Sequence, residues 1–166
     1  MGLLALPLIR QAVFNFLHDH DSQREYILMR EIEPLAIYLF LKDCRTLERK
    51  TSPGMMFRVV DVKKALESVV YPVEYSGKCA FAITDKQCPW NNKNFLLEVN
   101  DGAGSVKIIE AVDIDFEADI GPFSQLFSGF FSYQKLVDAG EINRTSSSNE
   151  PGRIFPEMYN LPRDFF

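Results

Sequence analysis

Residues 94–110 read NFLLEVNDGAGSVKIIE. Apolar residues alternate with polar ones on both sides of Asn100-Asp101-Gly102, which predicts paired strands over 94–99 and 105–110 joined by a hairpin turn. The glycines of 101–105 could also suggest a phosphate-binding loop, but such a loop leads into a helix and this one lies between two strands. We therefore interpret the stretch as a hairpin.

The segments around the hairpin add helices and further strands. Residues 78–84 and 55–60 predict strands, and Asp61 is placed to cap a helix over 62–68, because its carboxylate can accept backbone N–H groups of the first turn. Downstream we expect a strand near 111–116, helices over 121–128 and 132–139 that end at Gly129 and Gly140, and a polar loop over 141–153.

The N-terminal third forms a separate pattern. Apolar residues at steps of three and four predict a helix over 7–20, followed by a strand over 24–30 and a short helix from Pro34 to about Leu41. Residues 42–54 are charged and end in Pro-Gly, which is typical of a linker. A new unit is expected to begin after it.

Composition excludes several classes of protein. The chain has 166 residues, a formal charge of −5 and 46% hydrophobic residues, so it is globular and lacks the basic excess of a general nucleic-acid binder. No apolar run reaches the length of a membrane span. Cys44, Cys79 and Cys88 form no C-x-x-C pair, which indicates reduced thiols in a cytoplasmic protein rather than disulfides or a zinc site.

Two polar clusters could hold a metal ion, and neither has the required pattern. His18 and His20 lie two positions apart, so on a helix they point to different faces, and the chain has no other histidine. Four acidic residues alternate along one stretch, which favours a solvated strand face over a calcium loop: Asp113, Asp115, Glu117 and Asp119. The Asn143-Arg144-Thr145 sequon matters only in a secreted protein.

Aromatic residues gather toward the C-terminus. A helical stripe there could line a lipid cavity or pack in the core, and core is the favoured reading: Phe123, Leu126, Phe127, Phe130 and Phe131. The last residues, Phe165 and Phe166, are aromatic where termini are usually polar. They could simply close the core, or dock the Phe166 α-carboxylate in a defined site where it accepts a proton.

The order of motifs resembles the Eis-like (enhanced intracellular survival) branch of the GNAT acetyltransferases. The likeness begins at Met55–Val62 with Ala65-Leu66, and the upstream segments 7–20 and 24–41 resemble the end of that family's second domain. It continues through Asp85, Cys88-Pro89-Trp90-Asn91, Phe95, Ala111-Val112-Asp113, Leu126–Phe130, Leu136–Gly140 and the Asp164-Phe165-Phe166 tail.

The resemblance implies an α+β fold, namely a sterol-carrier-like mixed sheet with flanking helices, preceded by part of a GNAT-like domain. Residues 1–52 would be the C-terminal portion of a second, degenerate GNAT-like domain, and residues 53–166 the sterol-carrier-like C-terminal domain. Such proteins acetylate amine-bearing small molecules with acetyl-CoA and form homo-oligomers. The family's general base, the terminal carboxylate, maps to Phe166.

The acetyl-CoA loop of GNAT enzymes is missing from this sequence, so the resemblance places acetyl-CoA on a missing N-terminal domain. We expect this chain alone to be inactive, with no metal, no nucleic acid and no membrane among its partners. Two other functions stay open on these residues: a sterol-carrier-like module that binds a lipid or another small molecule, and a structural oligomerisation domain.

Overall fold

The computed structural model describes residue 48, residues 56–110 and residues 113–158. The predicted elements of 1–47, most of the predicted linker, the histidines, Cys44 and Phe166 lie outside this part of the chain. The proposed division into 1–52 and 53–166 therefore stays a prediction.

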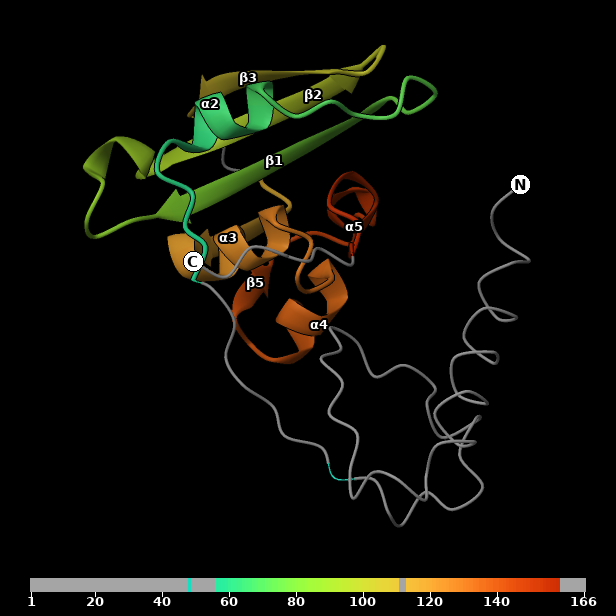
Figure 1. The fold of residues 1–166 in the computed structure, drawn as a ribbon. Helices are drawn as coiled ribbons and strands as arrows, with labels where there is room; N and C mark the ends of the chain where they lie inside the picture. Colours follow the sequence, from blue (N-terminus) through green and yellow to red (C-terminus); the bar gives the residue numbers. More distant parts are fainter. Residues whose placement is uncertain (1–47, 49–55, 111–112, 159–166) are drawn as a thin grey trace, which may run out of the picture. The chain divides into compact units, whose positions relative to one another are not determined.

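The described residues form a five-stranded mixed sheet with the order β3-β2-β1-β4-β5 (Figure 1). β1 pairs antiparallel with β2 and parallel with β4, and the two remaining pairs, β2–β3 and β4–β5, are antiparallel. The strands are β1 (Gly77–Thr84), β2 (Lys93–Asn100), β3 (Ala103–Ile109), β4 (Phe116–Asp119) and β5 (Ile142–Arg144). Together with the helices, this sheet confirms the α+β fold.

The predicted hairpin is confirmed, with a turn of two residues. Asn100 pairs with Ala103, so Asp101 and Gly102 alone form the turn, with φ of 48° and 77°. Positive φ at both central positions matches the right-handed twist of the flanking strands.

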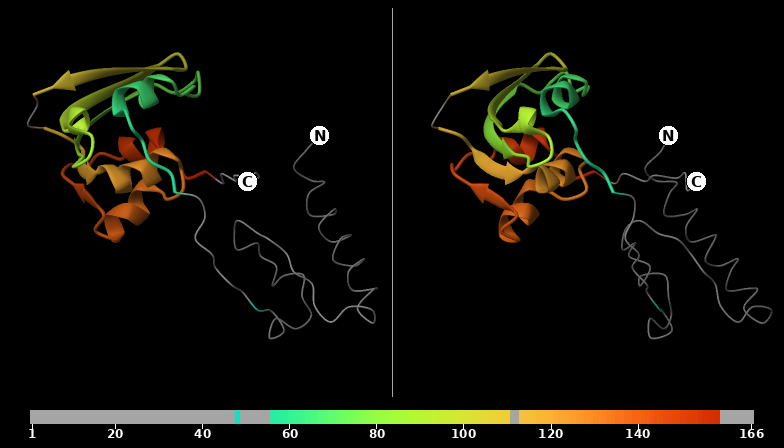
Figure 2. Two further views of the ribbon diagram at one scale, coloured as in Figure 1. Left: turned by 60° about the vertical axis from the view of Figure 1, so that its left-hand side comes forward. Right: turned by 90° about the vertical axis from the view of Figure 1, so that its left-hand side faces the viewer.

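In the described part of the chain, four helices and a 3-10 turn accompany the sheet. α2 (Val62–Glu67) is capped by the Asp61 carboxylate, which accepts the Lys64 N–H at 3.0 Å as predicted. α3 (Ile120–Phe127), α4 (Tyr133–Asp138) and α5 (Glu150–Ile154) lie together below the β2–β3 hairpin in Figures 1 and 2, and η4 (Pro89–Asn91) follows β1. Gly129 and Gly140 end α3 and α4 with φ of 70° and 73°, which confirms their expected role.

Three predictions were wrong in detail. Residues 56–60 form no strand, because the Val59 N–H and the Val60 carbonyl are bound by side chains instead of a neighbouring strand. The strand expected near 111–116 begins only at Phe116. The polar segment 141–153 contains β5 and most of α5, because burial of Ile142 and Ile154 outweighs its polar composition.

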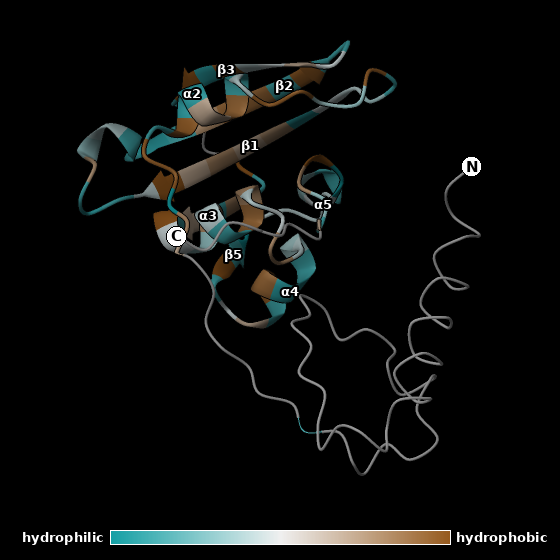
Figure 3. Cartoon of the chain, viewed as in Figure 1, coloured by the Kyte–Doolittle hydropathy of each residue, from teal (hydrophilic) through white to brown (hydrophobic). Residues whose placement is uncertain are grey.

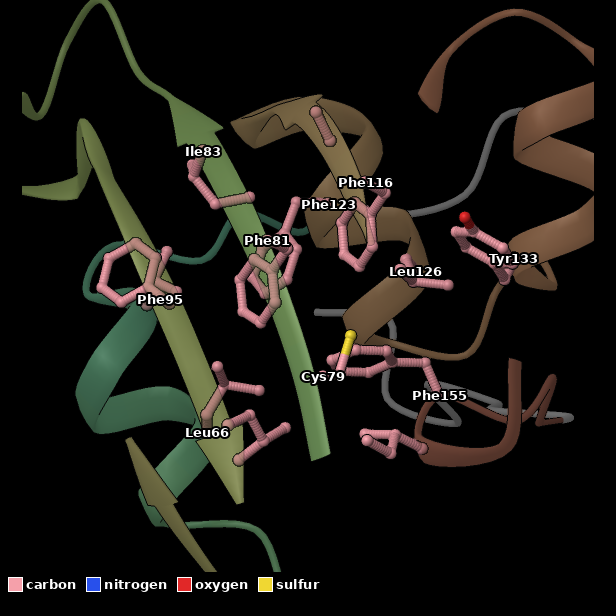
Figure 4. Packing of buried hydrophobic residues seen from close by; sticks show 14 of the residues in the cluster. Leu66, Cys79, Phe81, Ile83, Phe95, Phe116, Phe123, Leu126, Tyr133 and Phe155 are labelled. Carbon is pink, nitrogen blue, oxygen red and sulfur yellow. The ribbon is translucent and has the colours of Figure 1, made fainter. Parts of the chain in front are cut away.

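The core lies between one face of the sheet and the helices. Every second residue of β1 and β2 is buried, and β1 is apolar over most of its length (Figure 3). The Phe81 ring occupies the centre, with ring centroids at 5.0 to 6.4 Å from those of its aromatic neighbours (Figure 4): Phe95, Phe116, Phe123 and Phe155. Aromatic packing thus fills the middle of this core.

Candidate functional site

The loop after β1 is organised around the buried carboxylate of Asp85. Its Oδ1 accepts hydrogen bonds from Arg58 Nη2 at 2.6 Å and from the Gln87 and Cys88 backbone N–H groups at 2.9 Å each. Its Oδ2 accepts one from Asn91 Nδ2 at 3.0 Å. Four donors on one carboxylate fix the loop over 85–91, because each of them would otherwise lose a partner.

Side chains of this loop also hold the segment that leads into α2. Trp90 Nε1 and Asn91 Nδ2 both donate to the Val60 carbonyl at 2.9 Å. The Val62 N–H donates to Asn91 Oδ1 at 3.1 Å. A 3-10 turn that begins at Pro89 presents both side chains to the same stretch of backbone.

The electrostatics make Asp85 a structural anion and not a proton acceptor. Burial raises the pKa of this carboxyl, but the hydrogen bonds from Asn91, Cys88, Gln87 and Arg58 outweigh burial and lower its pKa to about 2. Hydrogen bonds to Cys88 and Asp85 in turn raise the pKa of Arg58. A general base at neutral pH needs a higher pKa than that of Asp85.

An open groove of about 500 Å³ lies beside this loop. The exposed apolar side chains of Val60, Trp90 and Ile108 line it together with the buried ring of Phe95. Its polar lining consists of Asp61, Lys63, Lys64, Asn91 and Lys93. A hollow with apolar walls and a few charged groups is the usual form of a small-molecule site.

A smaller hollow of about 210 Å³ is lined by Arg58 and by residues of the loop after β1. Arg58 and Lys86 contribute cations to it, and Asp85 and Asp119 contribute carboxylates. Because both charge signs meet there and Asp85 is already paired, this hollow favours no particular ligand.

The aromatic stripe predicted near the C-terminal end divides into a buried and an exposed part. Phe123 and Leu126 are buried in the core, as expected, whereas Phe130 is 63% exposed. Phe131 is exposed beside it, with its ring 4.7 Å from that of Phe130. The prediction of core packing therefore holds for α3 and fails for the residues after Gly129.

The acidic run has no metal-binding arrangement in the described structure. Asp113, Glu117 and Asp119 are exposed, which confirms the expected solvated face. Asp115 instead links β1 to the segment after β5, since its carboxylate accepts from the Ala80 N–H at 2.9 Å and from Ser146 Oγ at 2.7 Å. Within 56–110 and 113–158, no three His, Cys, Asp or Glu residues could hold a metal ion.

The remaining sequence candidates are placed as follows. Cys79 is a buried free thiol whose pKa is raised by burial, and Cys88 is a half-buried free thiol in the loop after β1. Phe166, the predicted catalytic residue, lies outside the described residues. None of the described helices is both long enough and apolar enough to cross a membrane.

The sequence did not predict the roles of two residues in this region. Arg58 lies in a stretch that suggested a strand, and nothing in the sequence pairs it with Asp85. Ile108 belongs to a strand with good alternation, so its place on the wall of a groove was not expected. Asp85, Trp90 and Asn91 were singled out, but only through the family resemblance.

Three of the solved structures that resemble this chain are described as acetyltransferases or a probable acyltransferase. A GCN5-related N-acetyltransferase from Anabaena variabilis is 22% identical with a TM-score of 0.52, covering 63% of this chain and 26% of that one. A probable N-acyltransferase from Enterococcus faecalis is 22% identical with a TM-score of 0.53, covering 61% and 25%. A GCN5-related N-acetyltransferase from Kribbella flavida is 17% identical with a TM-score of 0.52, covering 62% and 26%.

These similarities show a shared fold, and the chain spans about a quarter of the length of these three structures. No curated protein sequence matches the chain. A family model described as a sterol carrier protein domain matches residues 62–158, which is more than half of the 166 residues. The protein therefore belongs to the sterol carrier protein domain family.

Proposed function

We propose that this chain is the C-terminal part of an Eis-like, acetyl-CoA-dependent N-acetyltransferase that acts on amine substrates. The observation that supports it is the shared fold with one quarter of three larger proteins, each described as an N-acetyltransferase or a probable N-acyltransferase. In this proposal the acetyl-CoA site lies in another part of a longer protein.

The proposed catalytic contribution of this chain is the α-carboxylate of Phe166. An α-carboxyl group has an ordinary pKa of about 3.3–3.7, so it is ionised at neutral pH and can accept a proton. Desolvation in a docked position would raise its pKa and make it a stronger base toward an ammonium substrate. The neutral amine would then attack the thioester carbonyl of acetyl-CoA, so that the C–N bond of the amide forms, the C–S bond breaks and CoA leaves as a thiolate that takes up a proton.

The proposed second contribution is to hold copies of the protein together. Exposed apolar side chains near the C-terminal end of α3 support this role. Phe57 is 56% exposed and stacks on Phe127 with a centroid distance of 6.2 Å, and Phe130 and Met158 are exposed as well. The Met158 N–H binds the Gly129 carbonyl at 2.8 Å, so these residues lie near one another. Apolar surface of this kind is typical of contacts between subunits.

The test begins with the protein purified from its own cell. Its intact mass should exceed the 19.0 kDa of this chain, and that protein should transfer acetyl groups from acetyl-CoA to polyamines. Deleting Phe166 should reduce kcat and leave acetyl-CoA binding unchanged, whereas Phe166→Leu, which keeps the terminal carboxylate in place, should retain most activity. An intact mass of 19.0 kDa without acetyl transfer would contradict the proposal.

A second candidate is binding of a lipid, which membership of the sterol carrier protein domain family favours. The aromatic side chains around Phe81 fill the centre of the described core, so an acyl chain would have to displace them. Binding of a fluorescent fatty acid, with loss of binding in Phe123→Trp, would support this candidate. Absence of saturable binding would remove it.

A further inference from the structure

The groove beside the Asp85 loop exists because α2 covers only part of the sheet. α2 begins at Val62 and its Lys63 Nζ donates to the Val106 carbonyl of β3 at 2.7 Å. Val106 is buried there, but Ile108, two residues further along the same face, is 54% exposed. Its cross-strand partner Phe95 forms the floor of the groove.

One wall of this groove is a flat aromatic surface that is already held in place. The Trp90 side chain is 53% exposed, yet its Nε1–H is anchored to the Val60 carbonyl. An exposed indole that is fixed by a hydrogen bond can stack on a planar ligand at little cost in side-chain entropy. Val60 and Ile108 add exposed apolar surface to the same hollow.

The lysines of the groove differ in how their charge is paired. Three ammonium groups line it, from Lys63, Lys64 and Lys93, but Lys63 is paired with Glu67 and Lys64 with Asp61. Lys64 lies 3.3 Å from Asp61 but its side chain is 84% exposed, so this ion pair is solvated and weak. Within the described part of the chain, Lys93 has no ionic partner. The cations that remain for a ligand are therefore Lys93 and the weakly paired Lys64.

We propose that this groove binds a small anion that carries a planar aromatic ring. The ring would pack between Trp90 and Ile108, and a carboxylate, sulfonate or phosphate on the ring would face Lys93 and Lys64. The volume of about 500 Å³ falls within the range of small-molecule sites. This site is independent of the proposed acetyltransferase function, since it uses neither Phe166 nor acetyl-CoA.

The test uses the fact that Trp90 is the single tryptophan of the chain. Its indole N–H gives one cross-peak in a ¹⁵N NMR spectrum of the full chain, which reports directly on the groove. Titration with 2-naphthoate should shift this cross-peak saturably. The neutral 2-naphthylmethanol, which has the same ring, and octanoate, which has the charge without the ring, should both bind more weakly.

Variants with matched controls separate the groove from the rest of the surface. Lys93→Ala should weaken 2-naphthoate binding about threefold, as expected for one solvated ion pair. Lys86→Ala, a lysine outside the groove, should leave it unchanged. Ile108→Glu should abolish binding by placing a carboxylate in the groove, and Val73→Glu, at an exposed aliphatic residue outside the groove, should not.

Three outcomes would overturn the proposal. The first is that 2-naphthoate does not shift the Trp90 cross-peak up to its solubility limit. The second is equal affinity for 2-naphthoate and 2-naphthylmethanol, which would remove the role of the lysines. The third is tighter binding of octanoate, which would make the groove an acyl-chain site.

Discussion

Arg58 and Asp85, 27 positions apart in the sequence, are joined by an ion pair of 2.6 Å between Nη2 and Oδ1. The pair links the segment before α2 to the loop after β1. The Arg58 side chain reaches solvent, whereas that of Asp85 is fully buried. The two partners therefore have different importance for stability. Loss of the Asp85 carboxylate leaves all four donors without this acceptor, whereas loss of the Arg58 guanidinium leaves three donors on the carboxylate.

Replacing Asp85 with Ala should destabilise the protein by about 3 kcal/mol, because the Gln87 and Cys88 N–H groups and Asn91 Nδ2 lose their acceptor. Arg58→Ala should cost less, since three of the four donors to the carboxylate remain. Urea unfolding followed by circular dichroism gives both values. Asp138→Ala, at an exposed position on α4, is the control. An Arg58→Ala cost equal to or above that of Asp85→Ala would contradict this ranking.

Stability should fall between about pH 4 and pH 2, and Asp85 should account for a defined part of the loss. Its pKa is about 2 in the folded protein against an ordinary 3.8, so the ionised form favours folding above the ordinary value. That contribution, about 2–3 kcal/mol, disappears as the pH falls through the folded-state pKa. Hydrogen bonds from Lys107 and Lys78 also lower the pKa of Glu98 to about 2, so the loss is shared.

The variant Asp85→Asn isolates the contribution of Asp85 to this pH dependence. The urea midpoint of Asp85→Asn should change less than that of the wild type between pH 4 and pH 2. Glu98→Gln provides a comparison whose pH dependence should also weaken with added salt, because the lysines paired with Glu98 are exposed. An Asp85→Asn profile parallel to that of the wild type would show that Asp85 does not titrate in this range.

Local signals in the sequence are enough to predict most of this fold. Each of these signals acts within a few residues, so it can be predicted without knowledge of the tertiary structure: the turn at Asp101-Gly102, the Asp61 cap and the helix ends at Gly129 and Gly140. β5 and α5 were missed because they are short and polar. They form through packing of Ile142 and Ile154, which no local pattern reveals.

The site was harder to predict for a related reason. Asp85 looks like an ordinary loop carboxylate until Arg58 is brought to it from 27 positions away. The exposure of Ile108 depends on where α2 begins, which the alternation of β3 does not encode. Contacts across the fold, not residue types, create both features.

Removal of the Tyr133 hydroxyl, unlike removal of the Asp85 carboxylate, should not lower the stability of the protein. It is buried and has no hydrogen-bond partner among the described residues. Tyr133→Phe should therefore be neutral or stabilising by up to about 1 kcal/mol, because it removes an unpaired polar atom. Tyr71→Phe is the matched control, since the Tyr71 hydroxyl donates to the Leu66 carbonyl at 3.2 Å. Thermal unfolding should rank Tyr133→Phe above Tyr71→Phe, and the reverse order would indicate a partner for the Tyr133 hydroxyl.

Alanine substitutions at Gly129 and Gly140 distinguish the cost of backbone strain from the cost of steric crowding. Both have φ near +70°, where an L side chain costs about 1 kcal/mol. A Cβ on Gly140 would have no atom within 4 Å, whereas one on Gly129 would lie 2.9 Å from Met158 Cβ, 3.0 Å from Met158 N and 3.1 Å from the Pro156 carbonyl oxygen. Gly140→Ala should therefore cost about 1 kcal/mol, and Gly129→Ala about 2–4 kcal/mol.

The difference between these two variants tests how the segment over 156–158 is held. Urea unfolding gives the two free energies, and proteolysis of the native protein near Met158 should accelerate in Gly129→Ala alone, because the Met158 N–H would lose its bond to the Gly129 carbonyl. Gly129→Asn should recover part of the strain, since Asn tolerates positive φ, but not the crowding. Equal costs for Gly129→Ala and Gly140→Ala would mean that the segment does not pack against Gly129 in solution.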